Sequence, residues 1–422
     1  MELKAGKKVN LTNGTACTVV KELGRGGQGI VYLVELNGQQ KALKWYITAP
    51  DDAFYKNLQN NISNGAPSDA FIWPEYLTVK ENGSYGYVMA LRPSNYYEFG
   101  NFLLAKKNFS SFNAMIAAAM KICNGFMMLH RHGLSYQDLN DGNFFIDPET
   151  GDVLICDNDN VMPQGEKSGI MGKARYMAPE VVAGSVPDKY SDRFSLSVIL
   201  FMLFFANHPF EGAKVVACPC MTESFEKKFY GSEAVFIYDP VRGDNRPVRG
   251  IHQNVIRRWP AFPQLLKDTF IREFSQECLE NPEKRLIEQE WEKVIARVRD
   301  ILVYCPYCGE ETFVDETKQG HPCVNCGKSI DMSTYLAIGT RKLILTNKTK
   351  LYIDRDNKAD GEVMLNPADF SMLLIKNLSN DEWAAETPSG KSKIVKPQEM
   401  LPVKNGIKIT FNNLAKGEIV KA

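Results

Sequence analysis

A glycine-rich stretch, Gly24 to Gly29, constrains the fold of this chain more than any other feature, because a strand-like segment lies on each side of it. Residues 16–23 alternate between two faces, and Ile30 to Leu36 is largely apolar. Such patterns predict β-strands. The glycine loop of a dinucleotide-binding fold opens a helix instead. The pattern therefore predicts a β-hairpin closed by a glycine loop.

A third strand is predicted directly afterwards. Asn37-Gly38 is a strong signal for a two-residue hairpin. The following segment, Gln39 to Trp45, carries Lys44 behind the apolar pair Ala42-Leu43. A lysine here can be a surface residue whose stem lies on apolar neighbours. However, glycines let the backbone approach phosphate oxygens closely, and the spacing favours a phosphate contact for Lys44.

Two polar segments further along carry carboxylates. A helix is predicted from Ser110 or Ser111 to Arg131, and the loop 136–143 (YQDLNDGN) follows it. Two short strands come next, and the second one ends at Asp157. Turns in which Asn and Asp bond their own backbone explain part of the loop, but not the strand pair. Holding phosphates, neutralising them and aligning a hydroxyl are the requirements of phosphoryl transfer.

Taken in order, these pieces resemble the eukaryotic-type protein kinase family over about residues 11–301. The resemblance implies an α+β class and a bilobal kinase fold at 1–301, with a β-rich N-terminal lobe and a helical C-terminal lobe. It implies ATP as a ligand, covered by Gly24, Gly26, Gly27 and Gly29 and enclosed by Val31, Ala42, Met89 and Leu91.

The same resemblance assigns the remaining site residues. Lys44 and Asp138 would be catalytic, and Asn143 and Asp157 would hold Mg²⁺ or Mn²⁺. Within the family's Ala-Pro-Glu segment, Glu180 would form a structural ion pair with Arg285.

Several positions depart from the family pattern. Gln137 replaces an arginine, Asn140 replaces a lysine, and Gly172-Lys173 stands for Gly-Thr. Asp157-Asn158-Asp159 stands for Asp-Phe-Gly, and residues 54–62 offer no glutamate to pair with Lys44. Three functions are therefore considered. A Ser/Thr protein kinase, which we expect to phosphorylate itself too, is preferred over a nucleotide-binding pseudokinase scaffold. A small-molecule phosphotransferase is disfavoured by the Ala-Pro-Glu segment and the long helical half.

Four cysteines predict a metal site beyond the kinase-like region. Cys305, Cys308, Cys323 and Cys326 form two C-x-x-C pairs, a pattern typical of a tetrahedral, structural Zn²⁺ site. We therefore expect a zinc ribbon at 302–332. The ten cysteines as a whole favour a reducing cytoplasm over a disulfide framework.

The last segment, 333–422, has short strands separated by turn residues, which predicts a small all-β sandwich. It faintly resembles the forkhead-associated fold, but it lacks that family's Ser-x-x-His, so we expect a module that docks a partner protein.

Three segments of the kinase-like region resemble a bacterial kinase subgroup: Phe71-Ile72-Trp73-Pro74, Asp157-Asn158-Asp159-Asn160 and 208–212 (HPFEG). That resemblance implies signalling or stress response in a tellurite-resistance-associated system, with a PP2C-type phosphatase and a von Willebrand A-like protein as partners.

Charge and hydropathy limit the other classes of partner. Lys plus Arg and Asp plus Glu each total 50, so we expect no field that attracts nucleic acid or an acidic membrane. The N-terminal residues lack an apolar core typical of a signal peptide. The longest apolar run, Leu196 to Ala206, is too short to span a bilayer and predicts a buried helix. We therefore expect a cytoplasmic protein.

Overall fold

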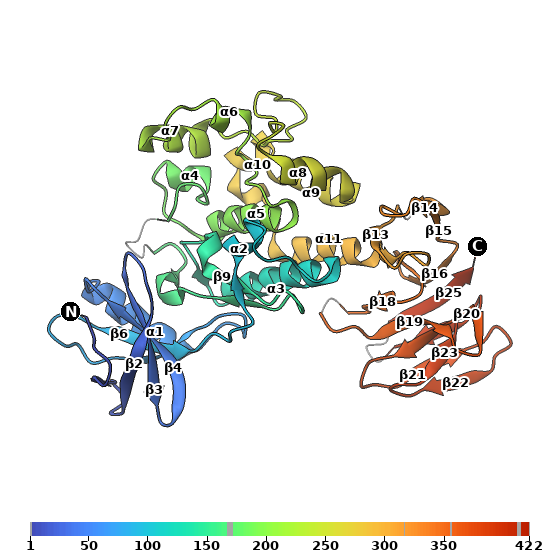
Figure 1. Ribbon diagram of the computed structural model, residues 1–422, viewed down its shortest axis with the longest axis horizontal. Coiled ribbons are helices and arrows are strands. Elements are labelled where there is room, and N and C mark those ends of the chain that lie inside the picture. The colour runs from blue at the N-terminus through green and yellow to red at the C-terminus, as the bar shows by residue number, and fades with distance from the viewer. Residues whose placement is uncertain (1, 167–171, 316, 355–356, 412–414, 422) are drawn as a thin grey trace.

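The computed structural model describes residues 2–166, 172–315, 317–354, 357–411 and 415–421. Two β-rich regions, one at each end of the chain, lie on opposite sides of a helical middle (Figure 1). The N-terminal region is one antiparallel sheet with the order β1-β2-β3-β4-β6-β5. Its strands are β1 (Lys8–Asn10), β2 (Ala16–Arg25), β3 (Gly29–Leu36), β4 (Gln39–Tyr46), β5 (Pro74–Leu77) and β6 (Gly86–Ala90).

Local sequence explains how this sheet is connected. Asn37 and Gly38 both have positive φ, 52° and 76°, which is the backbone that an Asn-Gly hairpin turn requires. Helix α1 (Asp52–Asn64) lies between β4 and β5 in the chain and packs beside β5. Asp51 caps it, because its carboxylate accepts a hydrogen bond from the N–H of Phe54 at 2.9 Å.

The helical lobe follows β6. Its helices are α2 (Phe99–Leu103), α3 (Phe112–Arg131), α4 (Pro179–Val182), α5 (Lys189–Phe205), α6 (Ala213–Val216), α7 (Glu223–Lys227), α8 (Gln253–Arg258), α9 (Gln264–Glu273), α10 (Gln276–Glu280) and α11 (Glu288–Asp300). Strand β7 (Tyr97–Glu98) directly precedes α2. Four more short strands lie between α3 and α4: β8 (Leu134–Ser135), β9 (Phe144–Ile146), β10 (Val153–Ile155) and β11 (Met162–Pro163).

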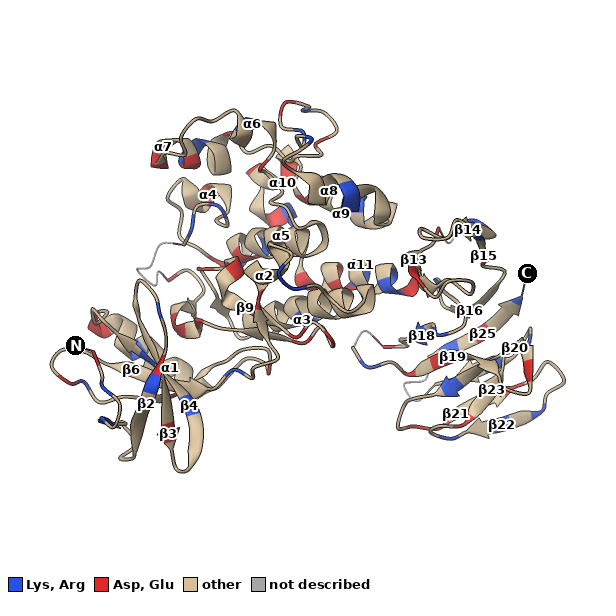
Figure 2. Cartoon of the chain, viewed as in Figure 1, with Lys and Arg blue, Asp and Glu red and all other residues tan. Residues whose placement is uncertain are grey.

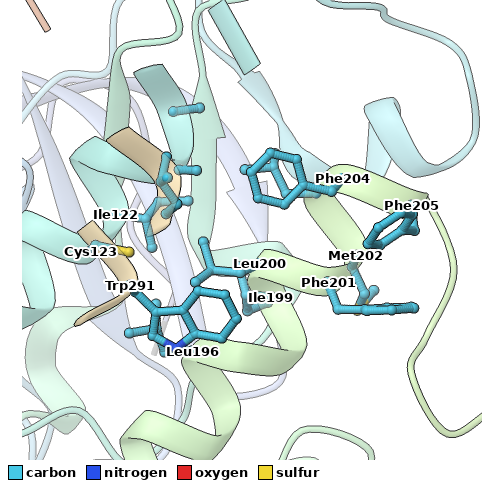
Figure 3. Close-up of a cluster of buried hydrophobic side chains, with 14 of the residues drawn as sticks. Ile122, Cys123, Leu196, Ile199, Leu200, Phe201, Met202, Phe204, Phe205 and Trp291 are labelled. Atoms are coloured by element: carbon cyan, nitrogen blue, oxygen red, sulfur yellow. The ribbon is translucent and has the colours of Figure 1, made fainter. Parts of the chain in front are cut away.

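The apolar run of the sequence is the core helix of this lobe. Every residue of α5 from Phe194 to Phe205 is buried, and Phe201 packs against Phe205 and Phe270. Figure 3 shows side chains of α5 gathered with Ile122, Cys123 and Trp291. Helix α3 is long and apolar enough to cross a membrane by length and composition, but 61% of that window is buried inside the fold. We interpret both as core helices.

Two small hairpins come next and form the ribbon. Strand β12 (Leu302–Tyr304) pairs with β13 (Glu311–Phe313), and β14 (Gly320–Pro322) pairs with β15 (Ser329–Asp331). Buried ribbon residues, among them Val303, Phe313 and Ile330, belong to the same apolar cluster as the helical lobe. The ribbon and the helical lobe therefore share one hydrophobic core.

The C-terminal region is a sandwich of two antiparallel sheets with its own core. One sheet has the order β17-β16-β25-β24-β21-β22 and the other β18-β19-β20-β23. The strands are β16 (Thr334–Ile338), β17 (Arg341–Ile344), β18 (Lys350–Leu351), β19 (Gly361–Asn366), β20 (Asp369–Asn377), β21 (Trp383–Glu386), β22 (Ser392–Val395), β23 (Met400–Pro402), β24 (Lys408–Thr410) and β25 (Lys416–Lys421). This agrees with the predicted all-β region.

An ion pair joins the sandwich to the helical lobe. Both acidic and basic residues lie along α11 (Figure 2). At its end, Asp300 accepts two hydrogen bonds from Arg341 on β17, at 2.7 and 2.8 Å. The neighbouring Arg299 lies over the ring of Tyr352, 3.8 Å from its centroid. A two-pronged arginine–carboxylate contact restricts orientation as well as distance, so the sandwich is held in one orientation on α11.

Candidate active site

The glycine loop joins β2 to β3, as the sequence predicts. A Cβ added at Gly24, Gly26 or Gly27 would meet nothing within 4 Å, so these residues border open space. Gly29 differs, since a Cβ there would lie 2.5 Å from the carbonyl oxygen of Trp45 on β4. Gly29 is therefore needed for strand packing, whereas the other three leave room above the site.

The four residues predicted to enclose adenine lie in one apolar cluster. Ala42 on β4 pairs with Met89 on β6, and Val31 and Leu91 pack against the same group. The cluster also contains Leu154 of β10, which the sequence analysis missed. Leu154 is half-buried between the fully buried Val153 and Ile155. The alternation along this short strand was the signal that could have identified Leu154.

Lys44 is buried under the glycine loop, which excludes the surface interpretation. Its side chain is 6% exposed, and Nζ lies 2.8 Å from Oδ2 of Asp159 and 3.4 Å from Oδ1 of Asp157. Gln28 of the loop accepts a third hydrogen bond from Nζ at 3.2 Å. Burial lowers the pKa of Lys44, but the two carboxylates outweigh it and raise that pKa above its ordinary value.

Asp159 is a residue that the sequence analysis missed as a partner of Lys44. It stands where the family has glycine, so it was considered only as a departure. Its side chain is fully buried. The hydroxyl of Tyr46 donates to its Oδ2 at 2.5 Å. Lysine, tyrosine and aspartate thus form a closed polar cluster beneath the loop.

Helix α1 occupies the place predicted for the helix that lacks a glutamate. Its buried face carries Asn57 and Asn61, and both amides donate to the carbonyl oxygen of Val161, at 2.8 and 2.9 Å. The acidic residue of α1, Asp52, is paired with Lys80 at the surface. The helix therefore contacts the segment after Asp159 through neutral amides.

The loop that carries Asp138 is held from below by α5. Asp192 accepts hydrogen bonds from the backbone N–H groups of Tyr136 and Gln137, at 2.6 and 3.2 Å. Beside them, the amide of Asn140 lies 3.4 Å from Oδ1 of Asp138. Burial, and then the charge of Asp157, raise the pKa of Asp138 to about 6. Asp138 is thus ionised at neutral pH but more basic than an ordinary aspartate.

Asn143 immediately precedes β9, and Asp157 follows the paired strand β10 by two residues. The N–H of Cys156 donates to the backbone oxygen of Asn143 at 2.8 Å. The Asn143 amide nitrogen donates to the carbonyl oxygen of Asp138 at 2.8 Å. Asp157 is in the left-handed region, with φ 55° and ψ 44°, and its side chain is 49% exposed. A half-exposed carboxylate and an amide oxygen are hard oxygen ligands, so these residues fit Mg²⁺.

The predicted structural pair is a two-pronged contact. Nη1 and Nη2 of Arg285 lie 2.7 and 2.8 Å from the two carboxylate oxygens of Glu180. Arg285 also donates to the carbonyl oxygens of Tyr190 and Cys278. The pair joins α4 to the loop that precedes α11.

A second candidate site lies in the ribbon. The sulfur atoms of Cys305, Cys308, Cys323 and Cys326 all lie within 4.8 Å of one another. Two of the distances are 3.7 Å, between Cys305 and Cys326, and 3.6 Å, between Cys308 and Cys323. Tetrahedral zinc with bonds of about 2.3 Å needs sulfurs about 3.8 Å apart. The four thiols therefore fit Zn²⁺.

The first part of the chain matches a known protein family. Residues 17–287 match the model of the family described as protein kinase domain. The chain belongs to this family. Its kinase domain therefore has the predicted β-rich and helical lobes. The match ends before the ribbon and the sandwich.

Individual relatives of the kinase domain are distant. Protein kinase C delta type of Mus musculus is 28% identical over 208 residues, which are 46% of this chain and 30% of that protein. A probable serine/threonine-protein kinase PknB of Lactococcus lactis is 25% identical over 217 residues, 47% of this chain and 33% of that protein. The chain thus spans about a third of the length of these curated relatives.

A solved structure is similar to part of this chain. A double mutant of the PknI kinase domain of Mycobacterium tuberculosis has a TM-score of 0.47 and 19% identity. The matched region covers 71% of this chain and 99% of the PknI structure.

Proposed function

We propose that this chain is a Ser/Thr protein kinase that uses ATP and Mg²⁺. The observation that supports the proposal most directly is the meeting of Lys44 and Asp157, which are far apart in sequence yet 3.4 Å apart in the fold. Asp138 is close enough for the charge of Asp157 to raise its pKa. The open glycine loop thus lies over three groups: a cation for the phosphates (Lys44), a carboxylate for a metal (Asp157) and a basic carboxylate for the hydroxyl (Asp138).

Each residue then has a definite task in phosphoryl transfer. Gly24, Gly26 and Gly27 leave room for backbone N–H groups to contact phosphate oxygens. Lys44 binds the α- and β-phosphates, and Val31 and Ala42 enclose the adenine. When bound by Asp157 and Asn143, Mg²⁺ neutralises phosphate charge.

Asp138 prepares the acceptor. It orients the hydroxyl of the serine or threonine and takes its proton. The hydroxyl oxygen forms a bond to the γ-phosphorus, while the bond from that phosphorus to the oxygen of the leaving ADP breaks. The raised pKa of Asp138 suits a base that must be ionised at neutral pH and still accept a proton.

A protein acceptor is supported by a cavity whose lining includes Gly172, where an added Cβ would lie 3.4 Å from Oδ1 of Asp138. The cavity has a volume of about 450 Å³ and lies between the segment before α4 and α7. Lys173, Met177, Val182 and Glu226 are among its lining residues. A small metabolite needs no such groove outside the catalytic loop, whereas an extended polypeptide does. Segments of this chain and separate partner proteins are both proposed as acceptors.

The ribbon and the sandwich are proposed to serve recruitment. Structural Zn²⁺ held by the four cysteines stabilises the ribbon, and the sandwich docks a partner protein. By the sequence resemblance, we propose a PP2C-type phosphatase and a von Willebrand A-like protein as these partners. Co-purification of the full chain with each protein, beside a variant truncated after residue 332, tests the docking role.

The first experiment is intact-mass spectrometry of the purified chain after incubation with Mg²⁺ and ATP. We expect added masses of about 80 daltons per phosphoryl group on the chain or on a generic protein acceptor. The Asp157→Ala variant should gain none, while Asp268→Ala, which removes an exposed carboxylate on α9, should behave like the native chain. Bound nucleotide without any transfer would favour the pseudokinase scaffold instead.

A further inference from the structure

We propose that Asp159 is the positioning residue for Lys44, and that the segment 153–161, rather than helix α1, determines whether the ATP site is competent. The proposal rests on the kinase function proposed above. It concerns how the lysine is held, which the family match does not specify.

The geometry around Asp159 is that of a fixed anchor. Nζ of Lys44 lies 2.8 Å from one carboxylate oxygen and 3.1 Å from the other. The hydroxyl of Tyr46 donates to the same carboxylate at 2.5 Å. Because the carboxylate is fully buried, losing a partner would leave an uncompensated charge in the interior. Asp159 and Lys44 therefore hold each other in one arrangement.

Within the described residues, the glycine loop, β6 and α1 provide no competing buried anion for Lys44. The glycine loop offers the neutral Gln28, and β6 offers Tyr87 opposite the lysine. The buried face of α1 consists of Phe54, Asn57, Leu58 and Asn61. Among the residues that the structure describes, the ion pairs of Lys44 are made with Asp157 and Asp159.

These two carboxylates are suited to different tasks. Asp157 is half-exposed and 3.4 Å from the lysine, whereas Asp159 is enclosed and closer. The exposed carboxylate can turn to a metal ion and leave the enclosed one in place. Lys44 therefore stays positioned when Asp157 takes up its role as a ligand.

This arrangement changes how the site can be regulated. In many protein kinases the lysine must pair with a glutamate on the helix, and displacement of the helix breaks the site. Here α1 is attached through the Asn57 and Asn61 amides to Val161. Displacement of α1 would break these neutral hydrogen bonds and leave the Lys44–Asp159 pair intact.

A double-mutant cycle tests the positioning role. Asp159→Asn keeps the size of the side chain and removes the charge, and we expect it to lower kcat by about tenfold or more. Lys44→Met should lower kcat further. The double variant should be no less active than Lys44→Met, because Asp159 acts through the lysine. Independent losses that multiply in the double variant would overturn the proposal.

Folding is followed on the same variants by circular dichroism and thermal unfolding without nucleotide. If Asp159→Asn does not fold, Tyr46→Phe removes one donor to the carboxylate and retains the charge pair. We then expect a smaller loss of kcat for Tyr46→Phe alone, and no added loss in the Lys44→Met background. An added loss there would count against the positioning role.

Two further measurements separate the parts of the proposal. Asn57→Ala leaves the Asn61–Val161 bond in place, and we expect kcat to stay within about twofold of the native value. A tenfold loss of kcat in a folded Asn57→Ala protein would show that α1 determines whether the site is competent.

If the native chain transfers no phosphate, the double-mutant cycle can be measured by urea unfolding, which still detects coupling between Lys44 and Asp159. Absence of that coupling would refute the pair itself.

Discussion

The carboxylate of Glu311, on strand β13 of the ribbon, accepts a hydrogen bond from the backbone N–H of Phe112 at 2.5 Å. Phe112 is the first residue of α3, and Ser111 caps the same end by accepting from the N–H of Ala114. The first N–H groups of a helix have no partner within it, and a negative charge there is favourable. The ribbon thus completes the beginning of a core helix in the kinase domain.

Glu311→Ala should destabilise the kinase domain. The variant leaves an N–H group of α3 without its partner, and we expect a loss of about 1 kcal/mol in the free energy of unfolding. Urea unfolding measures it, with Glu310→Ala as the matched control because Glu310 is exposed. Equal stabilities for the two variants would contradict the capping role.

Removal of the Zn²⁺ that we propose for the four cysteines should also weaken the kinase domain, because the ribbon and the helical lobe share one hydrophobic core. We expect a chelator to lower the melting temperature of the native chain and to have no effect on a Cys305→Ser/Cys323→Ser variant. Release of one equivalent of zinc can be followed with a colorimetric indicator. An unchanged melting temperature after full release would show that the ribbon fold does not depend on the metal.

Stability should fall as the pH rises from about 6.5 to 9. His130 is buried between Asp192 and Glu288, at 3.1 and 2.8 Å. Burial lowers its pKa, but the hydrogen bonds and charges of the two carboxylates outweigh this and raise that pKa to about 9. Because the pKa of His130 is higher in the folded than in the unfolded chain, its protonation stabilises the fold. This stabilisation is complete below the unfolded pKa of about 6.5 and is lost as the pH rises through the folded pKa.

Urea unfolding at pH 6, 7.5 and 9 checks this prediction, and we expect a total loss of roughly 3 kcal/mol. His130→Gln should flatten the dependence above pH 7. Glu273 also makes stability decrease with rising pH, but in a lower pH range, since burial raises its pKa to about 7. A native chain that is equally stable at pH 7.5 and 9 would contradict the role of His130.

Lys173→Ala should reduce turnover. Nζ of Lys173 donates to Oδ1 of Asn140 at 3.2 Å, and its charge lowers the pKa of Asp138. Without this cation, the pKa of Asp138 rises above about 6, so activity should be lost at a higher pH on the acid side. We expect a loss of about tenfold in kcat, and near-native activity for Lys173→Arg. An unchanged pH profile would exclude this electrostatic effect.

Gly27→Ala and Gly29→Ala should fail in different ways. The methyl group at 29 would meet the carbonyl oxygen of Trp45 at 2.5 Å, so we expect a lower melting temperature. The methyl group at 27 meets nothing within 4 Å, so stability should be retained while ATP affinity falls. Thermal unfolding and binding of a fluorescent ATP analogue distinguish the two. Weaker ATP binding with normal stability at both positions would assign both glycines to the phosphates.

Features that depend on neighbouring residues can be predicted from the sequence. Asn37-Gly38 encodes its turn and Ser111 its helix cap, because a few backbone dihedrals and local hydrogen bonds decide both. The order of the glycine loop, Lys44 and Asp138 was enough to predict the kinase fold, which the family match confirms.

The folded structure is needed to show which side chains that are distant in sequence meet. Asp159 lies 115 residues after Lys44, and no periodicity in either segment shows that the lysine has this partner in place of a helix glutamate. Glu311 at the start of α3 was missed for the same reason. These contacts depend on burial, because a buried charge is costly unless it is paired or hydrogen-bonded. Which partner is available depends on which segments pack together in the fold.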